Sequence, residues 1–393
     1  MRIGFDAKRA AQNRTGLGNY SRFVLRILSQ RGGGDELHLY IPNPRRTPFL
    51  GEIPTLAALR LHYPCGPVWR LLGSLWRVAG VWRDIRRDGM ALYHGLSNEL
   101  PLGIRRAGCR SVVTIHDLIF LHCPEYYHPV DRLIYNYKFR RACRVADRVV
   151  AVSEFTKREL MRYYGVPEAK IDVVYQGCDP SFAAPIAQET LDDVRRRYSL
   201  PPRFVLYVGS IERRKNLGLV AEAACLAARR GRKAGEAVPV IAVGRHTSYE
   251  DELRTYLRGQ GAEGAIRFVH GVPFADLPSF YRLATAFVYP SRIEGFGIPL
   301  LEAATSGVPA IGCTGSCLEE AGGPGAIYVD PDDAEAMADA MHTACTDGPR
   351  RQRMIAEGRA HAARFNDRRL ADELMEVYRK ALAGANEPPQ PRR

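Results

Sequence analysis

The sequence predicts an α/β protein built from two Rossmann-like domains, each with a parallel β-sheet covered by helices. Short apolar segments alternate with helix-forming segments along almost the whole chain, and the alternation restarts near residue 203. Such alternation is typical of parallel sheets, whose crossover connections are helices. A length of 393 residues is also too great for one domain of ordinary size and fits two. We expect the domains at 1–182 and 183–366, facing each other across a cleft.

The individual strands are predicted from short runs of apolar and β-branched residues bounded by turn-forming residues. In the first domain they lie at 2–6, 37–41, 59–63, 91–94, 111–115, 147–152 and 170–175, and in the second at 203–208, 240–243, 266–269 and 286–289. Residues 183–202 mix proline with acidic and basic side chains and are interpreted as the linker into the second domain. Two late helices are expected at 349–364 and 367–383, followed by a proline-rich basic tail, 384–393, that is predicted to be disordered.

Composition and charge limit the classes of function. The chain is 46% hydrophobic and 25% charged, as in globular proteins, and no apolar run is long enough for a membrane-spanning helix. The N-terminal MRIGFDAKRA indicates a strand rather than a signal peptide, and nine cysteines without paired metal-ligand spacing predict reduced thiols in the cytosol. The net charge of +13 favours an acidic partner: nucleotide phosphates, anionic lipid or nucleic acid. The sequence shows no nucleic-acid-binding motif, and we expect no nucleic-acid partner.

Residues 68–87 contain all three tryptophans and are predicted to form one amphipathic helix. Apolar side chains recur at helical spacing, whereas the arginines lie largely on the remaining surface. Two interpretations stay open. We favour docking of the apolar face on the first sheet, because every α/β layer needs such helices. The alternative is contact with an anionic membrane, which basic helices with exposed tryptophans make.

The most informative stretch is 286–320, where an apolar strand, a glycine-rich turn and a helix opened by proline follow one another. Gly295 and Gly297 lie just before the helix N-terminus. Free amides and the helix dipole favour an anion there, and glycine lets a ligand approach the backbone closely. Glu294 lies in the turn and Glu302 about one turn into the helix. We therefore expect the two carboxylates to face different parts of a ligand.

Two further segments place chemically useful residues at the carboxyl ends of predicted strands, where ligands bind in open α/β sheets. The sequence GSIERRKNLG, 209–218, brings Arg213, Arg214 and Lys215 close to a helix N-terminus. Such cations can stabilise a diphosphate by charge-assisted hydrogen bonds, although a solvated basic loop is the alternative. His116 directly follows the strand at the middle of the first domain.

Two other motifs carry weaker signals. Gly16 and Gly18 lie between a strand and a helix and can form a cradle for a phosphate or a sugar, or a simple tight turn. The third glycine of a dinucleotide fingerprint is missing, since Ser21 stands there. Asp330-Pro331-Asp332 has the D-x-D pattern of some metal sites. Because it ends a strand, we expect Asp332 or Asp333 to cap the next helix and predict no metal site.

The stretch 286–320 resembles the signature of retaining GT-B glycosyltransferases, most closely glycosyltransferase family 4, which carries E-x7-E in this setting. The matching pieces are the two acids eight residues apart, the intervening GFGIP and the following SGVP. The segments VVTIHDLIFLHCPEYY and AVSEFTKREL are also similar to the family, so the resemblance covers nearly the whole chain. It implies the GT-B fold, with an acceptor-side first domain, a second domain that binds the nucleotide sugar, and a last helix, 367–383, that packs back on the first domain.

The resemblance also implies roles for the candidate residues. Glu294 contacts hydroxyls of the transferred sugar, and Glu302 hydrogen-bonds the nucleotide ribose. His116 holds the donor sugar or shapes the approach of the acceptor. Three neighbours of His116 are secondary candidates: His94, His122 and Asp117.

The diphosphate is assigned to Lys215 and Arg214. Many relatives carry arginine where Ser210 stands, so the choice between Arg213 and Arg214 stays open. The further donor-binding residues that the resemblance implies lie in the glycine segment of the first domain and in turns of the second: Gly16, Gly18, Gly244, Val272, Gly295, Phe296, Gly297 and Ile298.

The implied activity is transfer of a hexose, with mannose favoured, from a nucleoside diphosphate sugar to a hydroxyl of a glycan or lipid-linked glycan, with retention at the anomeric carbon. Fixed cations and helix amides stabilise the leaving diphosphate, so no metal or other cofactor is predicted. The leaving phosphate would accept the proton of the attacking hydroxyl on the same face of the sugar. The expected location is the cytoplasm, with contact of 68–87 with the inner membrane face left open.

Two alternatives are a GT-B epimerase of nucleotide sugars and a basic nucleic-acid or anionic-surface binding protein with a degenerate GT-B fold. The epimerase is disfavoured because the E-x7-E stretch and the basic loop occur together. The retained Glu294, Glu302 and Lys215 disfavour the binding protein.

Overall fold

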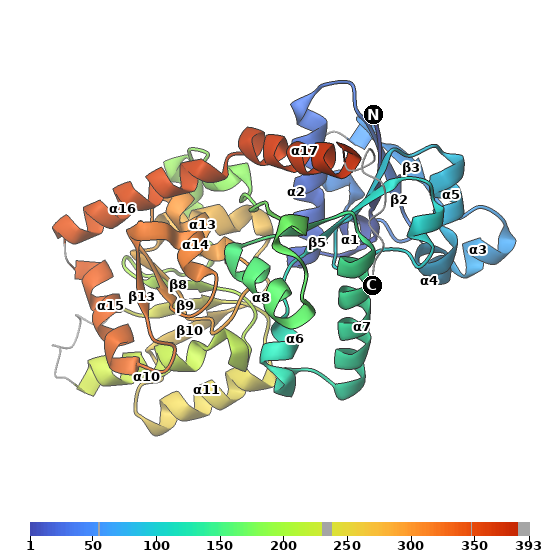
Figure 1. Cartoon of the computed structure of the whole chain (residues 1–393). Coiled ribbons are helices and arrows are strands. Elements are labelled where there is room, and N and C mark those ends of the chain that lie inside the picture. The colour runs from blue at the N-terminus through green and yellow to red at the C-terminus, as the bar shows by residue number, and fades with distance from the viewer. Residues whose placement is uncertain (54–55, 230–237, 347, 384–393) are drawn as a thin grey trace. The chain divides into compact units, whose positions relative to one another are not determined.

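Two parallel β-sheets, each in its own compact unit, organise the chain, as the sequence predicts (Figure 1). The computed structural model describes residues 1–53, 56–229, 238–346 and 348–383. The first unit comprises Met1–Gln176 and the segment that starts at Asn366, and the second comprises Gly177–Phe365. The tail at 384–393, predicted to be disordered, lies outside the described residues.

The sheet of the first unit has seven parallel strands in the order β3-β2-β1-β4-β5-β6-β7. Its strands are β1 (Arg2–Asp6), β2 (Glu36–Tyr40), β3 (Arg60–His62), β4 (Leu92–Gly95), β5 (Arg110–Ile115), β6 (Arg148–Ala151) and β7 (Ile171–Val173). The chain moves outward from β1 to β3 and then crosses to the other side of β1 to form β4. The sheet therefore has a topological switch point between β1 and β4, where such sheets bind ligands.

The helices of the first unit cover this sheet. They are α1 (Lys8–Gln12), α2 (Gly16–Arg31), α3 (Pro67–Leu71), α4 (Gly73–Leu75), α5 (Trp82–Arg87), α6 (Ile119–His122), α7 (Pro129–Val145), α8 (Glu154–Tyr164) and α17 (Asp367–Ala383). The helix α17 lies beside α2 (Figure 1), and ion pairs Arg26–Asp367 and Arg31–Asp372 join the two. The structure thus includes the last helix in the first unit.

The second sheet has six parallel strands in the order β10-β9-β8-β11-β12-β13. They are β8 (Val205–Val208), β9 (Val240–Val243), β10 (Ile266–Val269), β11 (Ala286–Tyr289), β12 (Ala310–Cys313) and β13 (Ala326–Val329). The helices are α9 (Gln188–Arg197), α10 (Leu217–Arg229), α11 (Ser248–Gly259), α12 (Leu277–Leu283), α13 (Ile298–Ser306), α14 (Leu318–Gly322), α15 (Ala334–Thr346) and α16 (Gly348–Ala362). This sheet has its switch point between β8 and β11.

The second unit begins earlier than the expected residue 183. Phe182 is fully buried, and its ring lies 5.2 Å from that of Tyr281 on α12. Cys178 contacts the hydroxyl of Thr305 on α13 at 3.3 Å. Because of these contacts, residues 177–182 belong to the second unit. The predicted linker at 183–202 is also wrong in part, because it contains the helix α9.

The single helix predicted at 68–87 is wrong. The segment forms α3, α4, a π-helical turn at Trp76–Gly80 and α5. Leu72 has φ −102° and ψ 42°, which interrupts the helix. Gly73 approaches another segment so closely that a Cβ there would lie 2.1 Å from the carbonyl oxygen of Pro42. The backbone next to the break therefore packs against residue 42, which the local sequence cannot reveal.

The tryptophans of this segment face the protein interior, as the favoured interpretation predicts. Trp76 is 1% exposed, and Trp69 and Trp82 pack against the same buried cluster. The aliphatic side chains around Trp69 and before Trp76 face solvent instead. These exposed residues, which we call the α3–α4 apolar surface, are Val68, Leu71, Leu72 and Leu75.

Candidate active site

The carboxylate of Glu294 collects four hydrogen-bond donors on one oxygen. Lys215 Nζ and Arg214 Nη1 donate to Oε1, the arginine over 3.4 Å. The hydroxyls of Tyr289 and Ser291 donate to the same oxygen over 3.1 and 2.6 Å. Lys215 also donates to the Tyr289 hydroxyl over 2.6 Å. No side chain of the described residues donates to Oε2, which therefore keeps its capacity to accept from a ligand hydroxyl.

These groups come from the carboxyl ends of two adjacent strands. Arg214 and Lys215 lie on a 3₁₀ turn, Arg213–Lys215, after β8, and Glu294 lies in the turn after β11. The strands β8 and β11 pair with each other at the switch point of the sheet. The structure therefore brings together Lys215, Arg214 and Glu294, which the sequence predicts as catalytic, at the position where open α/β sheets bind ligands.

The electrostatics of this cluster keep its charges in place. Burial would raise the pKa of Glu294, but the charges of Lys215 and Arg214 outweigh it and hold that pKa below its ordinary value. The carboxylate is therefore ionised at neutral pH. Burial, and then the charge of Glu294, raise the pKa of the Tyr289 hydroxyl well above its ordinary value, so it remains a donor. Such preorganised charges are effective where new charge develops during a reaction.

Two neighbouring arginines of the basic loop have different partners. Arg214 is 15% exposed at its side chain and also donates to the carbonyl oxygen of Ile293 over 2.9 Å. Arg213 is 60% exposed, pairs with Glu252 and stacks on Tyr249, with its guanidinium 5.0 Å from the ring centroid. The geometry groups Arg214, and not Arg213, with Glu294.

The glycine turn at 295–297 leads into α13 as the sequence predicts. Gly297 is the N-terminal cap residue, with φ +108°, and a Cβ there would lie 2.8 Å from Leu318, so only glycine fits. The side chain of Phe296 is 2% exposed, and its ring lies 5.6 Å from that of Phe365. Its side chain therefore belongs to the core, and a ligand can reach only its backbone. Gly295 begins this turn, and Ile298 is the first residue of α13.

Glu302 lies one turn into α13 and accepts a hydrogen bond from the hydroxyl of Tyr281 over 2.8 Å. Burial raises its pKa to about 7; the Tyr281 hydrogen bond opposes this rise, and the charge of Asp179 adds to it. Its partners differ from those of Glu294, in line with the expectation that the two acids serve different parts of a ligand.

In the first unit, His116 follows β5 and is 7% exposed. Its Nε2 lies 2.9 Å from the carbonyl oxygen of Leu96, which must accept, so Nε2 carries the proton and Nδ1 is an acceptor. Its backbone N–H donates to Asn98 Oδ1 over 2.8 Å, and the Tyr20 ring lies edge-on at 4.5 Å. Burial lowers the pKa of His116 to about 4, so the imidazole is neutral at physiological pH. It can accept a hydrogen bond from a sugar hydroxyl.

The secondary candidates have structural partners. His94 is fully buried, and its ring nitrogens contact the hydroxyls of Thr114 at 2.9 Å and Tyr378 at 2.8 Å. It thereby joins β4 and β5 to α17. His122 Nε2 contacts a carboxylate oxygen of Glu159. Asp117 Oδ1 accepts from the backbone N–H at the start of α6.

The glycine segment differs from the prediction. Gly16 and Gly18 lie in the first turn of α2, which begins at Gly16, and not in a loop before the helix. A Cβ at Gly18 would lie 1.8 Å from the carbonyl oxygen of Asn13, so this glycine is required by backbone packing. A Cβ at Gly16 would meet no described atom within 4 Å.

Two of the expected donor-binding residues, Gly244 and Val272, lie after β9 and β10. Gly244 follows β9, and a Cβ there would lie 2.4 Å from the carbonyl oxygen of Gly209. Its own carbonyl oxygen contacts His270 Nδ1 at 2.8 Å. Val272, after β10, is half-buried. The close approach of the 209 and 244 backbones explains glycine at 244, whatever its role toward a ligand.

The sequence prediction missed Tyr289, Ser291 and Tyr281. Tyr289 and Ser291 carry a signal that could have found them, since both lie between a strand end and Glu294 and have hydroxyl groups. Tyr281 has no such local signal, because it lies on α12 and meets Glu302 only in the folded protein.

Asp333, which directly follows the D-x-D segment, caps a helix, in agreement with the prediction of Asp332 or Asp333. Asp333 Oδ1 accepts from the N–H of Ala336 over 2.9 Å at the start of α15, and Asp332 forms an ion pair with Arg292 at 2.5 Å. Within the described ranges, no group of three or more His, Cys, Asp or Glu residues could hold a metal ion. Likewise, none of the helices described is both long and apolar enough to cross a membrane.

Known proteins match the chain in both units. The family model "Glycosyltransferase Family 4" matches residues 15–182, and "Glycosyl transferases group 1" matches residues 192–361. O-antigen chain mannosyltransferase B of Escherichia coli is 30% identical over 397 residues, which cover 96% of this chain and 100% of that protein. Serotype-specific mannosyltransferase WbdA of Escherichia coli is 27% identical over 285 residues, which cover 71% of this chain and 34% of that protein.

Solved structures share the fold. Anabaena HepE in complex with UDP and glucose superimposes with a TM-score of 0.72 at 18% identity, covering 96% of this chain and 99% of that one. Together with the two parallel sheets, this likeness confirms the predicted GT-B fold class.

Proposed function

Because the chain belongs to glycosyltransferase family 4, we propose that this glycosyltransferase moves a mannosyl residue from GDP-mannose to a hydroxyl of a lipid-linked or polysaccharide glycan. Mannose is supported by the likeness to O-antigen chain mannosyltransferase B and to mannosyltransferase WbdA. In this proposal the second unit binds the donor and the first unit binds the acceptor.

The bond that breaks joins the anomeric carbon to a β-phosphate oxygen, and its electron pair leaves with the diphosphate. Lys215, Arg214 and the amides at the N-terminus of α13 would stabilise that growing negative charge. A fixed cation pair supplies what a bound metal supplies in other transferases. On this basis we propose that no metal is required, and that activity survives treatment with a chelator.

The bond that forms joins the acceptor oxygen to the anomeric carbon, and the acceptor proton passes to the leaving phosphate oxygen. The Oε2 atom of Glu294 would accept from a hydroxyl of the transferred sugar. Two cations share the charge of this carboxylate, which weakens it as a nucleophile. We therefore propose attack on the face that the diphosphate leaves, with retention, which the anomeric coupling constants of the product would report.

One observation carries the proposal: Lys215, Arg214, Tyr289 and Ser291 converge on a single oxygen of Glu294 at the sheet's switch point. A core packing role does not need two cations and two hydroxyls on one buried carboxylate. A donor site does, because the same cations must neutralise a diphosphate while the carboxylate orients the sugar.

The test compares two tyrosines at neighbouring strand ends. Tyr289→Phe removes a hydroxyl that contacts both Lys215 and Glu294, and should lower kcat/KM with GDP-mannose by about 10- to 100-fold. Tyr207→Phe is the matched control, because its hydroxyl donates to the carbonyl oxygen of Ser210 and, among the described residues, forms no hydrogen bond with Lys215 or Glu294. GDP should raise the melting temperature of both variants, whereas Lys215→Ala should lose that shift. Equal activity of the two tyrosine variants would refute the assigned site.

We also propose that the first unit contacts an anionic membrane at the inner face. The support is the α3–α4 apolar surface, on which Leu71 is 85% exposed and Val68 62% exposed. Such side chains, flanked by arginines, suit insertion among lipid headgroups.

A further inference from the structure

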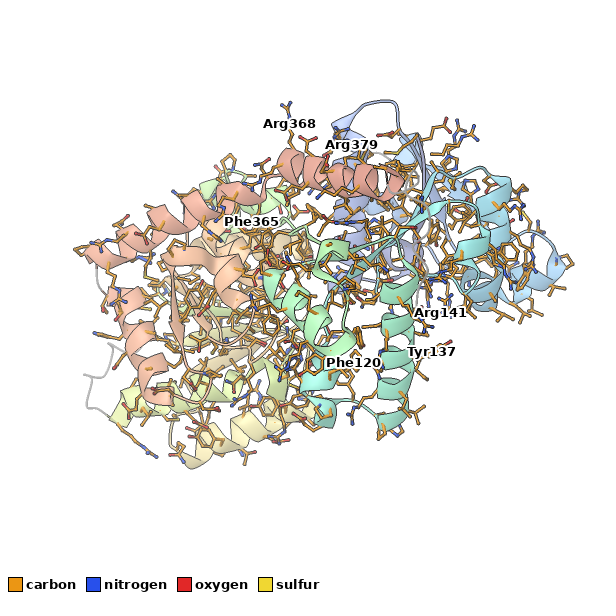
Figure 2. The ribbon with its side chains drawn as sticks, viewed as in Figure 1. Phe120, Tyr137, Arg141, Phe365, Arg368 and Arg379 are labelled. Atoms are coloured by element: carbon orange, nitrogen blue, oxygen red, sulfur yellow. The ribbon has the colours of Figure 1, made fainter. Side chains whose placement is uncertain are left out.

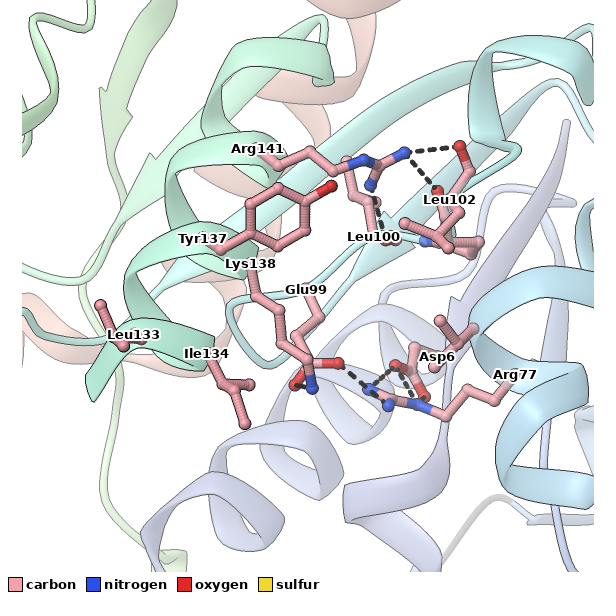
Figure 3. A pocket seen from close by; sticks show the side chains of 12 residues that line it. Asp6, Arg77, Glu99, Leu100, Leu102, Leu133, Ile134, Tyr137, Lys138 and Arg141 are labelled. Carbon is pink, nitrogen blue, oxygen red and sulfur yellow. Dashed lines mark hydrogen bonds and ion pairs between the residues drawn. The ribbon is translucent and has the colours of Figure 1, made fainter. Parts of the chain in front are cut away.

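A groove in the first unit lies at its switch point, the position that corresponds to the donor site in the second unit. The groove encloses about 400 Å³, within the size range of small-molecule sites. Asp6, the last residue of β1, and residues 99–102, which follow β4, form one side. The helix α7 forms the other side (Figure 3).

Three large apolar or aromatic side chains of α7 line the groove and are open to solvent. Leu133, Ile134 and Tyr137 line the groove and are 72%, 43% and 64% exposed. Leu102 faces them from the opposite wall and is 51% exposed. Tyr137 and Arg141 lie about one turn apart on α7 (Figure 2). Large apolar side chains grouped on one exposed face mark a binding surface.

The side chains at the inner end of the groove are polar and are joined to one another by ion pairs. Arg77 pairs with Asp6 at 2.6 Å and with Glu99 at 3.1 Å, and Lys138 pairs with Glu99 at 3.3 Å. Arg77 and Asp6 are 10% and 5% exposed at their side chains, whereas Lys138 is 38% exposed. Lys138 therefore offers a cation to a ligand without leaving Glu99 unpaired, since Arg77 remains.

The loop between the groove and His116 fixes their separation. Arg141 donates to the carbonyl oxygens of Leu100 and Pro101 over 3.2 and 3.3 Å, which holds the groove side of the loop. The residue before Glu99 is Asn98, which holds the backbone of His116. Adjacent Cα atoms are about 3.8 Å apart, so the polar end of the groove begins beside the His116 site.

We propose that this groove binds the apolar chain of a lipid-phosphate acceptor, with the phosphate at Lys138 and the reacting sugar toward His116. The inference rests on the proposed function and narrows its acceptor to a lipid-linked one. The lining of the groove carries three cations, Arg77, Lys138 and Arg141, against the two carboxylates of Asp6 and Glu99. An apolar wall that leads to a polar end, in a groove with this positive surplus, matches an amphiphile with an anionic head. Charge supports the same occupant: residues 1–176 and 366–393 contain 34 Lys and Arg against 20 Asp and Glu, whereas residues 177–365 contain 22 against 23. The short distance to His116 implies that few sugars separate the lipid from the reacting hydroxyl.

The experiment uses dodecyl phosphate, below the concentration at which it forms micelles, in calorimetric titrations of the full chain. Leu133→Gln should weaken binding about tenfold, the loss expected from exposing roughly two methylene groups. Val130→Gln is the matched control: it lies on α7 and is 55% exposed, but does not line the groove. It should keep the wild-type Kd. Inorganic phosphate should bind more weakly than dodecyl phosphate, because it lacks the chain.

Two outcomes would overturn the inference. Equal weakening by Val130→Gln would assign binding to the exposed side of α7 at large, and wild-type affinity no better than that for inorganic phosphate would leave no chain site. The stabilisation of all three proteins by GDP is measured in parallel. If GDP fails to stabilise the proteins, the proposed donor site is contradicted. Whether the groove binds a lipid phosphate is decided separately, by the dodecyl phosphate titrations.

Discussion

Glu302 is a buried acid whose pKa is raised to about 7, chiefly by its burial. The folded state therefore binds a proton more tightly than the unfolded state, where the ordinary value of 4.5 applies. Stability from this group is fully present below about pH 4.5 and is lost as the pH rises through about 7. Above that pH, the folded protein holds a charged carboxylate in a buried position, which lowers its free energy of unfolding.

Replacing this carboxyl group by an amide should remove that dependence. Glu302→Gln should match the wild type near pH 5 and exceed its free energy of unfolding by about 2 kcal/mol near pH 8. The amide oxygen can still accept from Tyr281, so the hydrogen bond is kept. Denaturant unfolding at both pH values measures the difference, and a difference that does not change with pH would contradict the raised pKa.

At the level of single residues, sequence patterns could predict Glu294, Lys215 and Arg214, because each follows a recognisable strand and each carries a charge. They could not predict that four donors share one oxygen of Glu294. That arrangement depends on the pairing of β8 with β11, which are about 80 residues apart, and on side-chain geometry. Tyr281 was missed for the same reason.

At the level of elements, the start of α2 offers a matched pair of glycines. Gly18→Ala should lower the free energy of unfolding by about 2 kcal/mol, because its Cβ would overlap the carbonyl oxygen of Asn13. Gly16→Ala should raise it by about 0.5 kcal/mol, because its Cβ meets open space and alanine restricts the unfolded chain. Chemical denaturation of both variants tests this pair. Equal effects would show that neither glycine is needed for packing.

Elements were predictable where one local pattern decides the structure. The strands at Arg2–Asp6, Val240–Val243, Ile266–Val269 and Ala286–Tyr289 occur where apolar runs predict them. A single helix at 68–87 was predicted wrongly: the helix is interrupted at Leu72, beside Gly73, whose backbone packs against residue 42, which is distant in sequence. The first turn of α2 was interpreted as a loop because it contains two glycines. In the structure, Gly18 is needed there because a Cβ would overlap the carbonyl oxygen of Asn13.

At the level of the whole molecule, two parallel-sheet units could be predicted from the alternation of strands and helices. The resemblance also implied that the last helix belongs with the first domain, and the structure includes α17 in the first unit although it follows the second in sequence. With these boundaries, the positive surplus lies entirely in the first unit.

This asymmetry predicts how the protein binds membranes. Vesicles that contain phosphatidylglycerol should bind it, with affinity that falls steeply between about 0.05 and about 0.5 M NaCl, because salt screens attraction between a cationic surface and anionic lipid. Neutral phosphatidylcholine vesicles should bind weakly at every salt concentration.

Leu71→Gln should reduce binding about fivefold through lost insertion of the α3–α4 apolar surface. Phe274→Gln, an exposed apolar residue of the second unit, is the control and should bind as the wild type does. Co-sedimentation measures the binding of each protein to each kind of vesicle. Equal losses of binding in the two variants would assign membrane contact to neither surface.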